Sequence, residues 1–173
     1  AWPALETAQD GSWVLRAAGG YTKRANSVQC LNPADDDDAP ERLDRAAAWF
    51  AERRLPPVFR VTPLCGTGLL RALSAAGWRP YDHSQVLAMP LVAERHHAPP
   101  GLDLLAPTDP AWLDVQQRLP GYSDATREKL RAIVAVMPPQ ARGVVLRDAE
   151  GRAVASAVIA IAHGTAVANN VIT

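Results

Sequence analysis

The strongest constraint on the fold lies in the last quarter of the chain, where three apolar segments follow one another closely. Residues 143–147, 153–162 and 165–173 are rich in the aliphatic and β-branched side chains typical of strands. The segments between them, Asp148–Gly151 and His163–Gly164, have the length and composition of tight turns. Because turns this short join antiparallel neighbours, these residues predict an antiparallel meander.

The residues ahead of the meander predict one strand and two helices. Residues 102–105 have strand composition. Asp109 is expected as an N-cap, with Pro110 at the first helical position. Ser123 is expected to cap the second helix. The apolar faces of these two helices are expected to hold Trp112, Val115 and Leu119, and Leu130, Ile133, Val134 and Met137.

The first half of the chain is expected to alternate strands with helices. Two strands are predicted around a turn at Gly19–Gly20, and one helix face is predicted from Leu43 to Phe50. A second helix is expected to end at Gly77. The predicted strands are 13–18, 21–31, 58–61 and a mostly extended 78–91, whose Val86–Met89 is apolar enough for the centre of a sheet.

Four consecutive carboxylates, Asp35 to Asp38, precede the first helix. Asp38 with Glu41 three residues later resembles a capping box. A cation site is the alternative for the cluster, but the alternating ligands and the glycine of a calcium loop are lacking. A charged helix start, placed at the positive end of the helix dipole, is the preferred interpretation.

Composition narrows the class of protein. Lys plus Arg and Asp plus Glu both number 18, so net charge gives no reason to expect nucleic acid or an anionic membrane as partner. There is no apolar run of about 18 residues and no secretory signal at the start. Cys30 and Cys65 are expected as free thiols, and the protein as cytoplasmic. His96–His97 lacks further ligands at metal spacing, so no metal is expected.

A Pro- and His-containing stretch without periodicity suggests a boundary. We therefore predict an N-terminal module over residues 1–92, a linker over 93–101 and a second domain over 102–173. The chain starts without methionine and stops directly after an apolar strand, so we expect truncation at both ends.

The order of strand, two helices and meander in residues 102–173 resembles the N-terminal half of a GNAT N-acetyltransferase domain. The segments WVLRAAGGYTKRANSVQCL, LPPVFRV and GWRPYDHSQVLAMPL resemble the N-terminal module of two-part bacterial GNAT proteins. The resemblance implies an α/β (α+β) fold of mixed, mainly antiparallel sheets flanked by helices, in two halves. It also implies an acyl-CoA-dependent N-acetyltransferase that uses acetyl-CoA as cosubstrate.

In the superfamily, the fourth strand of the domain is followed by a Gln/Arg-x-x-Gly-x-Gly/Ala loop that binds the pyrophosphate of acetyl-CoA through backbone N–H groups. That loop does not occur among the 173 residues, so inactivity of this form is expected. The resemblance further implies that backbone groups of the fourth strand hold the pantetheine arm. By position these are Val171, Ile172 and Thr173; no catalytic residue can be assigned.

Residues for the amine acceptor are suggested at two places. Asn169 and Asn170 are adjacent amides in a strand, and so point to opposite faces. They would contact substrate or pantetheine, or else form a satisfied edge or bulge. Tyr122 and Ser123 lie where the superfamily places substrate contacts, although capping and packing explain them too. The densest polar group of the first module faces the second domain or a ligand, or consists of exposed strand positions; it comprises Arg16, Tyr21, Lys23, Arg24 and Asn26.

The sequence leaves three alternative functions open. The first is transfer of an acetyl group from acetyl-CoA to an unidentified amine. The second is a non-catalytic GNAT-like scaffold that binds a ligand or partner. The third is a regulatory dimerisation unit that uses the exposed edge of the last strand to form a homodimer.

Overall fold

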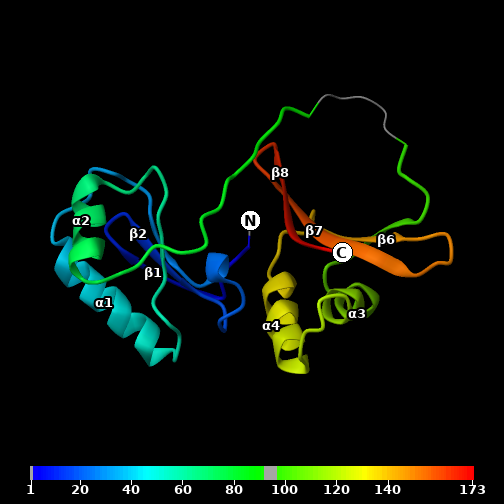
Figure 1. The fold of residues 1–173 in the computed structure, drawn as a ribbon, viewed down its shortest axis with the longest axis horizontal. Helices are drawn as coiled ribbons and strands as arrows, with labels where there is room; N and C mark the ends of the chain where they lie inside the picture. Colours follow the sequence, from blue (N-terminus) through cyan, green and yellow to red (C-terminus); the bar gives the residue numbers. More distant parts are fainter. Residues whose placement is uncertain (1, 92–96) are drawn as a thin grey trace.

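The computed structural model describes residues 2–91 and 97–173. Within them the chain forms two four-stranded sheets, each covered on one face by two α-helices (Figure 1). We refer to residues 2–91 as the N-terminal unit and to residues 97–173 as the C-terminal unit. The mixed α+β fold with mainly antiparallel sheets is the class predicted from the sequence.

The N-terminal unit has the strand order β1-β2-β3-β4, with antiparallel pairs except for a parallel β3–β4 pair. Trp13 and Leu15 of β2 face α1 and α2, because alternate strand residues point to one face. The elements are β1 (Glu6–Asp10), β2 (Trp13–Ala17), the 3₁₀ turn η1 (Lys23–Ala25), β3 (Val28–Cys30), α1 (Ala39–Glu52), β4 (Phe59–Arg60) and α2 (Thr67–Ala75).

The C-terminal unit has the strand order β5-β6-β7-β8, antiparallel throughout. The predicted meander is therefore confirmed. Asp109 Oδ1 accepts a hydrogen bond from Ala111 N at 2.8 Å, so the predicted cap of α3 is also confirmed. The elements are β5 (Leu102–Leu105), α3 (Pro110–Arg118), α4 (Asp124–Ala135), β6 (Arg142–Arg147), β7 (Ala153–Ala162) and β8 (Thr165–Ile172).

One hydrophobic core spans both units. It is built around Trp112 and Ile133 of the C-terminal unit, and Trp2, Ala18 and Ala25 of the N-terminal unit pack into it. Trp2 is only 1% exposed. Full burial of a large apolar side chain stabilises by roughly 1.5–3 kcal/mol, so the contact of the two units is part of the folded core.

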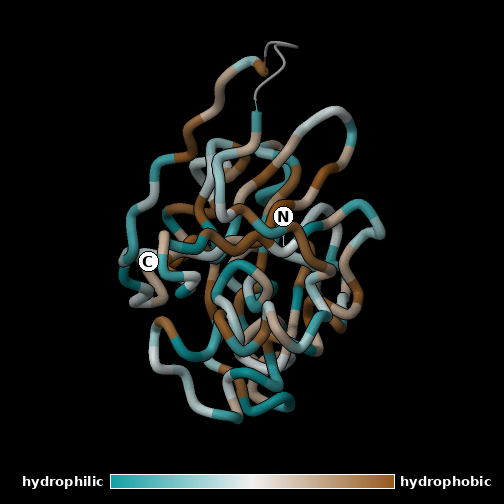
Figure 2. The backbone as a smooth tube through the Cα atoms, turned by 90° about the vertical axis from the view of Figure 1, so that its right-hand side faces the viewer, coloured by the Kyte–Doolittle hydropathy of each residue, from teal (hydrophilic) through white to brown (hydrophobic). Residues whose placement is uncertain are grey.

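Three predictions about the N-terminal unit are wrong. Residues 78–91 form no strand, and Val86 and Leu87 are 82% and 87% exposed. Figure 2 shows the hydrophobic stretch before the grey residues standing apart from the rest of the tube. The neighbouring strand β4 has only two residues, which leaves little edge for pairing.

The second wrong prediction is a single strand over 21–31, which is interrupted by η1 and leaves only β3. The third is the capping box of α1. Asp38 adopts a left-handed conformation with φ 52° and makes no side-chain cap bond. In addition, β1 was not predicted from the sequence.

The linker predicted at 93–101 falls partly on residues 92–96, which lie outside the described residues, as does His96. The domain division stays a prediction. None of the helices in the described ranges has the length and apolar character needed to cross a bilayer.

Candidate functional site

A β-bulge near the end of β8 is the most distinctive feature of the C-terminal sheet. In the β7–β8 ladder, Val158 pairs with Asn169 and Ser156 pairs with Ile172. The single residue Ala157 therefore lies opposite two residues of β8, Asn170 and Val171. Asn170 has a φ of 49°, a left-handed conformation that Asn tolerates better than most residues. Such a bulge breaks the ladder locally and redirects the strand.

Side chains of α3 donate to two carbonyl groups at the bulge. Trp112 Nε1 donates to the carbonyl of Ala157 at 3.0 Å. Gln116 Nε2 donates to the carbonyl of Asn170 at 3.3 Å, and Gln116 Oε1 accepts from Asn170 Nδ2 at 2.7 Å. Gln116 Nε2 also donates to Ser156 Oγ at 2.9 Å. Both polar atoms of the buried Gln116 amide are thus hydrogen-bonded, and two of these bonds connect α3 to the bulge residue Asn170.

Close packing of α3 on β6 makes these contacts possible. Trp112 is fully buried, and a Cβ at Gly143 would lie 2.6 Å from its ring carbons. Only the missing side chain of Gly143 lets the indole lie this close to the sheet. The position of the Trp112 and Gln116 donors under the bulge therefore depends on a glycine in β6.

The N-terminal unit also contacts the bulge. The Tyr21 hydroxyl donates to Asn170 Oδ1 at 3.0 Å, and Arg24 Nη1 donates to Asn169 Oδ1 at 3.4 Å. The Tyr21 ring meets Trp2 and Tyr122 edge to face, each at 6.1 Å between centroids. Burial raises the pKa of Tyr21 to about 12, so its phenol stays protonated and able to donate.

The structure brings together some of the residues predicted for the site. Asn169 is 4% exposed, Asn170 is half-buried, and Tyr122 lies against Tyr21 beside them. Val171 is 67% exposed at the bulge. Ile172 is half-buried, and Thr173 is exposed at the end of β8.

Ser123 stands apart from this group. It is exposed, and its Oγ accepts a hydrogen bond from Thr126 N at 3.3 Å as the N-cap of α4. This is the capping alternative that the sequence left open.

Two residues of the site, Trp112 and Gln116, had not been recognised as polar contacts. Trp112 was expected only as part of an apolar helix face. Gln116 sits one turn after it, within the buried face of α3 that also holds Leu113 and Val115. A polar side chain on an otherwise apolar helix face is the signal that could have identified it, because buried amides require partners.

One buried donor at the site has no acceptor. Asn169 Nδ2 meets no hydrogen-bond partner in the part of the chain that the structure describes. An unpaired buried amide group is costly, and such groups are few in folded proteins. The amide of Asn169 is thus the one side chain of the bulge whose hydrogen-bonding capacity is only half used.

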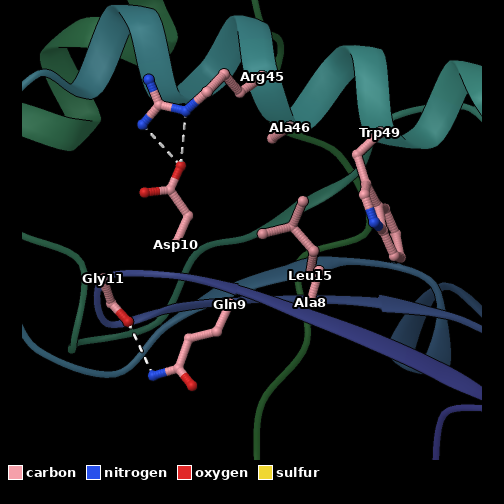
Figure 3. A pocket seen from close by; sticks show the side chains of 8 residues that line it. All are labelled: Ala8, Gln9, Asp10, Gly11, Leu15, Arg45, Ala46 and Trp49. Carbon is pink, nitrogen blue, oxygen red and sulfur yellow. Dashed lines mark hydrogen bonds and ion pairs between the residues drawn. The ribbon is translucent and has the colours of Figure 1, made fainter.

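A hollow of about 440 Å³ lies elsewhere, on the N-terminal unit (Figure 3). It lies between α1 and the β1–β2 hairpin. Its polar groups are already engaged with one another: Arg45 Nη2 contacts Asp10 Oδ2 at 2.8 Å, and Gln9 Nε2 donates to the carbonyl of Gly11 at 3.0 Å.

The residues described include no cluster of three or more His, Cys, Asp or Glu side chains able to hold a metal ion. Cys30 and Cys65 are both buried free thiols. Burial is the main cause that raises the pKa of the Cys65 thiol, which makes it a poor nucleophile.

Two mainly antiparallel sheets with helices on one face and a bulged fourth strand are consistent with a GNAT-type acetyltransferase, and the comparisons establish that class. The chain belongs to the family described as probable histone acetyltransferase Rv0428c C-terminal, whose family model matches residues 1–168. The predicted relationship to GNAT acetyltransferases is therefore confirmed.

A curated relative is the uncharacterized N-acetyltransferase YobR of Bacillus subtilis (strain 168), 29% identical over 142 residues. The match covers 80% of this chain and 56% of the relative, so the chain spans little more than half the length of that protein. No solved structure matches the chain.

Proposed function

We propose that the chain serves the transfer of an acetyl group from acetyl-CoA to an amine acceptor, with the bulged end of β8 as the place where the thioester is held. The observation that carries the proposal is the bulge at Asn170–Val171, in a strand whose second edge has no partner among the described strands. The acetyltransferase family to which the chain belongs supports the same assignment.

The backbone of β8 supplies the groups that this role needs. A strand paired along one edge leaves alternate N–H and C=O groups free on the other. A pantetheine arm laid along that edge would bond to them as an added strand does. An N–H aimed at the thioester oxygen would polarise the carbonyl for attack. We assign Val171, Ile172 and Thr173 to this contact.

The proposal concerns the thioester end of the cofactor. The Gln/Arg-x-x-Gly-x-Gly/Ala pattern that binds pyrophosphate does not occur among residues 1–173. We therefore expect these residues by themselves to bind acetyl-CoA no better than acetyl-pantetheine, and to turn over slowly.

The acceptor amine is assigned to the side of the bulge that faces Asn169, Asn170 and Tyr122. The unpaired Asn169 Nδ2 would donate to an oxygen of the acceptor or of the cofactor. The amine must be neutral to attack the thioester, so a general base is required, and no side chain is assigned to that role.

The test is a titration of the 173-residue chain with S-acetyl-pantetheine and with acetyl-CoA, followed by amide chemical shifts. Saturable shifts confined to residues 169–173, with those of β1 unchanged, are expected. A Val171→Pro variant, which lacks the N–H at the bulge, is expected to lose them. Val86→Pro, at an 82% exposed position outside both sheets, is its control.

Binding followed by release of the free thiol in the presence of an amine panel would support acetyl transfer. Binding without thiol release from any amine would favour the non-catalytic scaffold instead. The absence of saturable shifts at β8 up to millimolar thioester would contradict the assignment of the site.

A further inference from the structure

We propose that Tyr21, a residue of the N-terminal unit, is a positioning residue for the bulge of β8, and that the acetyl-transfer edge is therefore set by both units. This inference rests on the proposed function. It assigns to the N-terminal unit a defined role in the site of the C-terminal unit.

The first step is the clamping of Asn170 at both ends of its amide. Its Nδ2 donates to Gln116 Oε1 at 2.7 Å, and its Oδ1 accepts from the Tyr21 hydroxyl at 3.0 Å. One clamp comes from α3 of the C-terminal unit and the other from the N-terminal unit. With both in place, the side chain of the left-handed residue has a single orientation, which fixes the backbone at the bulge.

The second step is that these bonds continue through the sheet. From Gln116 the chain of hydrogen bonds passes to Ser156 Oγ at 2.9 Å, and from Ser156 to the carbonyl of Val144 at 2.7 Å. Tyr21 thus stands at the outer end of a path that crosses β8, α3, β7 and β6. Hydrogen bonds in such buried series support one another, so loss of the first is felt at the bulge.

The third step is that Tyr21 is itself held in place. Asn26, 6% exposed, accepts from the backbone N–H groups of Ala18 and Gly20 at 2.7 and 2.9 Å and donates to the carbonyl of Thr22 at 2.7 Å. The loop that carries Tyr21 is therefore fixed on both sides of the tyrosine. A donor mounted on a fixed loop can position its acceptor, whereas one on a mobile loop would follow it.

The hydroxyl is separable from the ring. The edge-to-face contacts of Tyr21 with Trp2 and Tyr122 need only the aromatic ring, which phenylalanine also provides. Tyr21→Phe therefore removes the bond to Asn170 and preserves the packing. Tyr81→Phe is the matched control, because Tyr81 is 58% exposed and its ring contact with Lys23 does not need the hydroxyl.

The experiment compares wild type, Tyr21→Phe and Tyr81→Phe in amide hydrogen exchange and in turnover of acetyl-pantetheine with an amine accepted by the wild type. For Tyr21→Phe we expect exchange at residues 169–172 to rise roughly tenfold and kcat to fall roughly tenfold, with KM for the amine little changed. Tyr81→Phe should match wild type in both. Asn170→Gly keeps the positive φ but removes the bonds to both Tyr21 and Gln116, so it should raise exchange at residues 169–172 at least as much as Tyr21→Phe.

The pH profile separates positioning from proton transfer. A positioning role lowers kcat by the same factor from pH 6 to pH 10, because Tyr21 stays protonated over that range. Loss of a limb of the profile in Tyr21→Phe would make Tyr21 a proton-transfer group and overturn the inference. Unchanged exchange at residues 169–172 would overturn it as well, whatever the activity.

Failure of the proposed function looks different. If the wild-type chain binds no acetyl thioester, the proposed function fails. Faster exchange at the bulge in Tyr21→Phe would still support the link between Tyr21 and β8.

Discussion

Each unit buries a polar side chain on a helix, and the two side chains differ in charge. In the N-terminal unit the group is charged: Arg42, 4% exposed, pairs with Asp35 Oδ1 at 2.8 Å and lies over the Trp13 ring at 4.2 Å. In the C-terminal unit it is neutral: Gln116 bonds to Ser156 and Asn170. Burial of charge is far more costly than burial of an amide, so the first cluster depends strictly on its partners.

The two clusters also differ in what they connect. Arg42 of α1 binds the carbonyl and carboxylate of Asp10 at the β1–β2 turn, and Asp35 in the loop before the helix. All of its partners are internal, so the cluster ties local elements of one unit together. The neutral network ends instead at a strand edge and involves both units. We conclude that the charged cluster serves stability and that the neutral network serves geometry.

The largest expected effect is that of removing the charge. Arg42→Met leaves Asp35 and Asp10 without their shared cation and should lower the free energy of unfolding by about 3 kcal/mol. Arg45→Met is the control, since Arg45 pairs with the same Asp10 but is 58% exposed, and it should cost less than about 1 kcal/mol. Urea denaturation measures both. Equal decreases in the free energy of unfolding would show that the burial of Arg42 does not make its ion pairs more important for stability.

A smaller loss is expected from the neutral network. Gln116→Leu leaves the Asn170 amide and carbonyl without their partner on α3 and should cost about 2 kcal/mol. The neighbouring Gln117→Leu should cost under about 1 kcal/mol, because the Gln117 bond to Asp124 at 2.7 Å is exposed. If Gln116→Leu proved neutral or stabilising, the bulge would not depend on α3, and the comparison would fail.

The smallest effects are expected in the dependence of stability on pH. The hydrogen bond from Arg42 holds the pKa of Asp35 well below its usual range. Its contribution is present above the unfolded pKa of about 4 and is lost as pH falls further. Burial is the main cause that raises the pKa of Tyr21 to about 12, so the stability that Tyr21 contributes depends on pH in the opposite direction. Its contribution is complete below the unfolded value of about 10 and is lost as pH rises towards 12.

Urea midpoints measured from pH 2 to pH 12 test this division. Asp35→Asn should reduce only the acid slope and Tyr21→Phe only the alkaline slope. A variant that changed both slopes would mean that the two clusters are coupled.

The parts of the fold that local sequence determines could be predicted. The meander needs only apolar segments and short turns, and the caps at Asp109 and Ser123 bond to N–H groups two and three residues away. The cap expected at Asp38 failed because the neighbouring carboxylates have distant partners. Asp35 accepts from Ser12 N at 2.6 Å, and Asp36 from Gly68 N at 2.8 Å.

The candidate site was only partly predictable for the same reason. Adjacent amides drew attention to Asn169 and Asn170, but the bulge and its support depend on residues far away in sequence. Gln116 lies 54 positions from Asn170, and Tyr21 lies 149 positions from it. The apolar pattern of Val86–Met89 predicted a strand that the structure does not contain. A strand also needs a neighbouring strand for pairing, and composition does not show whether one is present.

The absent side chain at position 143 links sequence variation among relatives to the geometry of the bulge. Since a Cβ there would meet the Trp112 ring at 2.6 Å, any larger residue requires a smaller one at 112 or a shift of α3 away from the sheet. A smaller residue at 112 removes the donor to Ala157, and a shift of α3 moves both Trp112 and Gln116 away from the bulge. Positions 143, 112 and 116 should therefore vary together across the family, and relatives that break the pairing are those in which β8 has been reshaped.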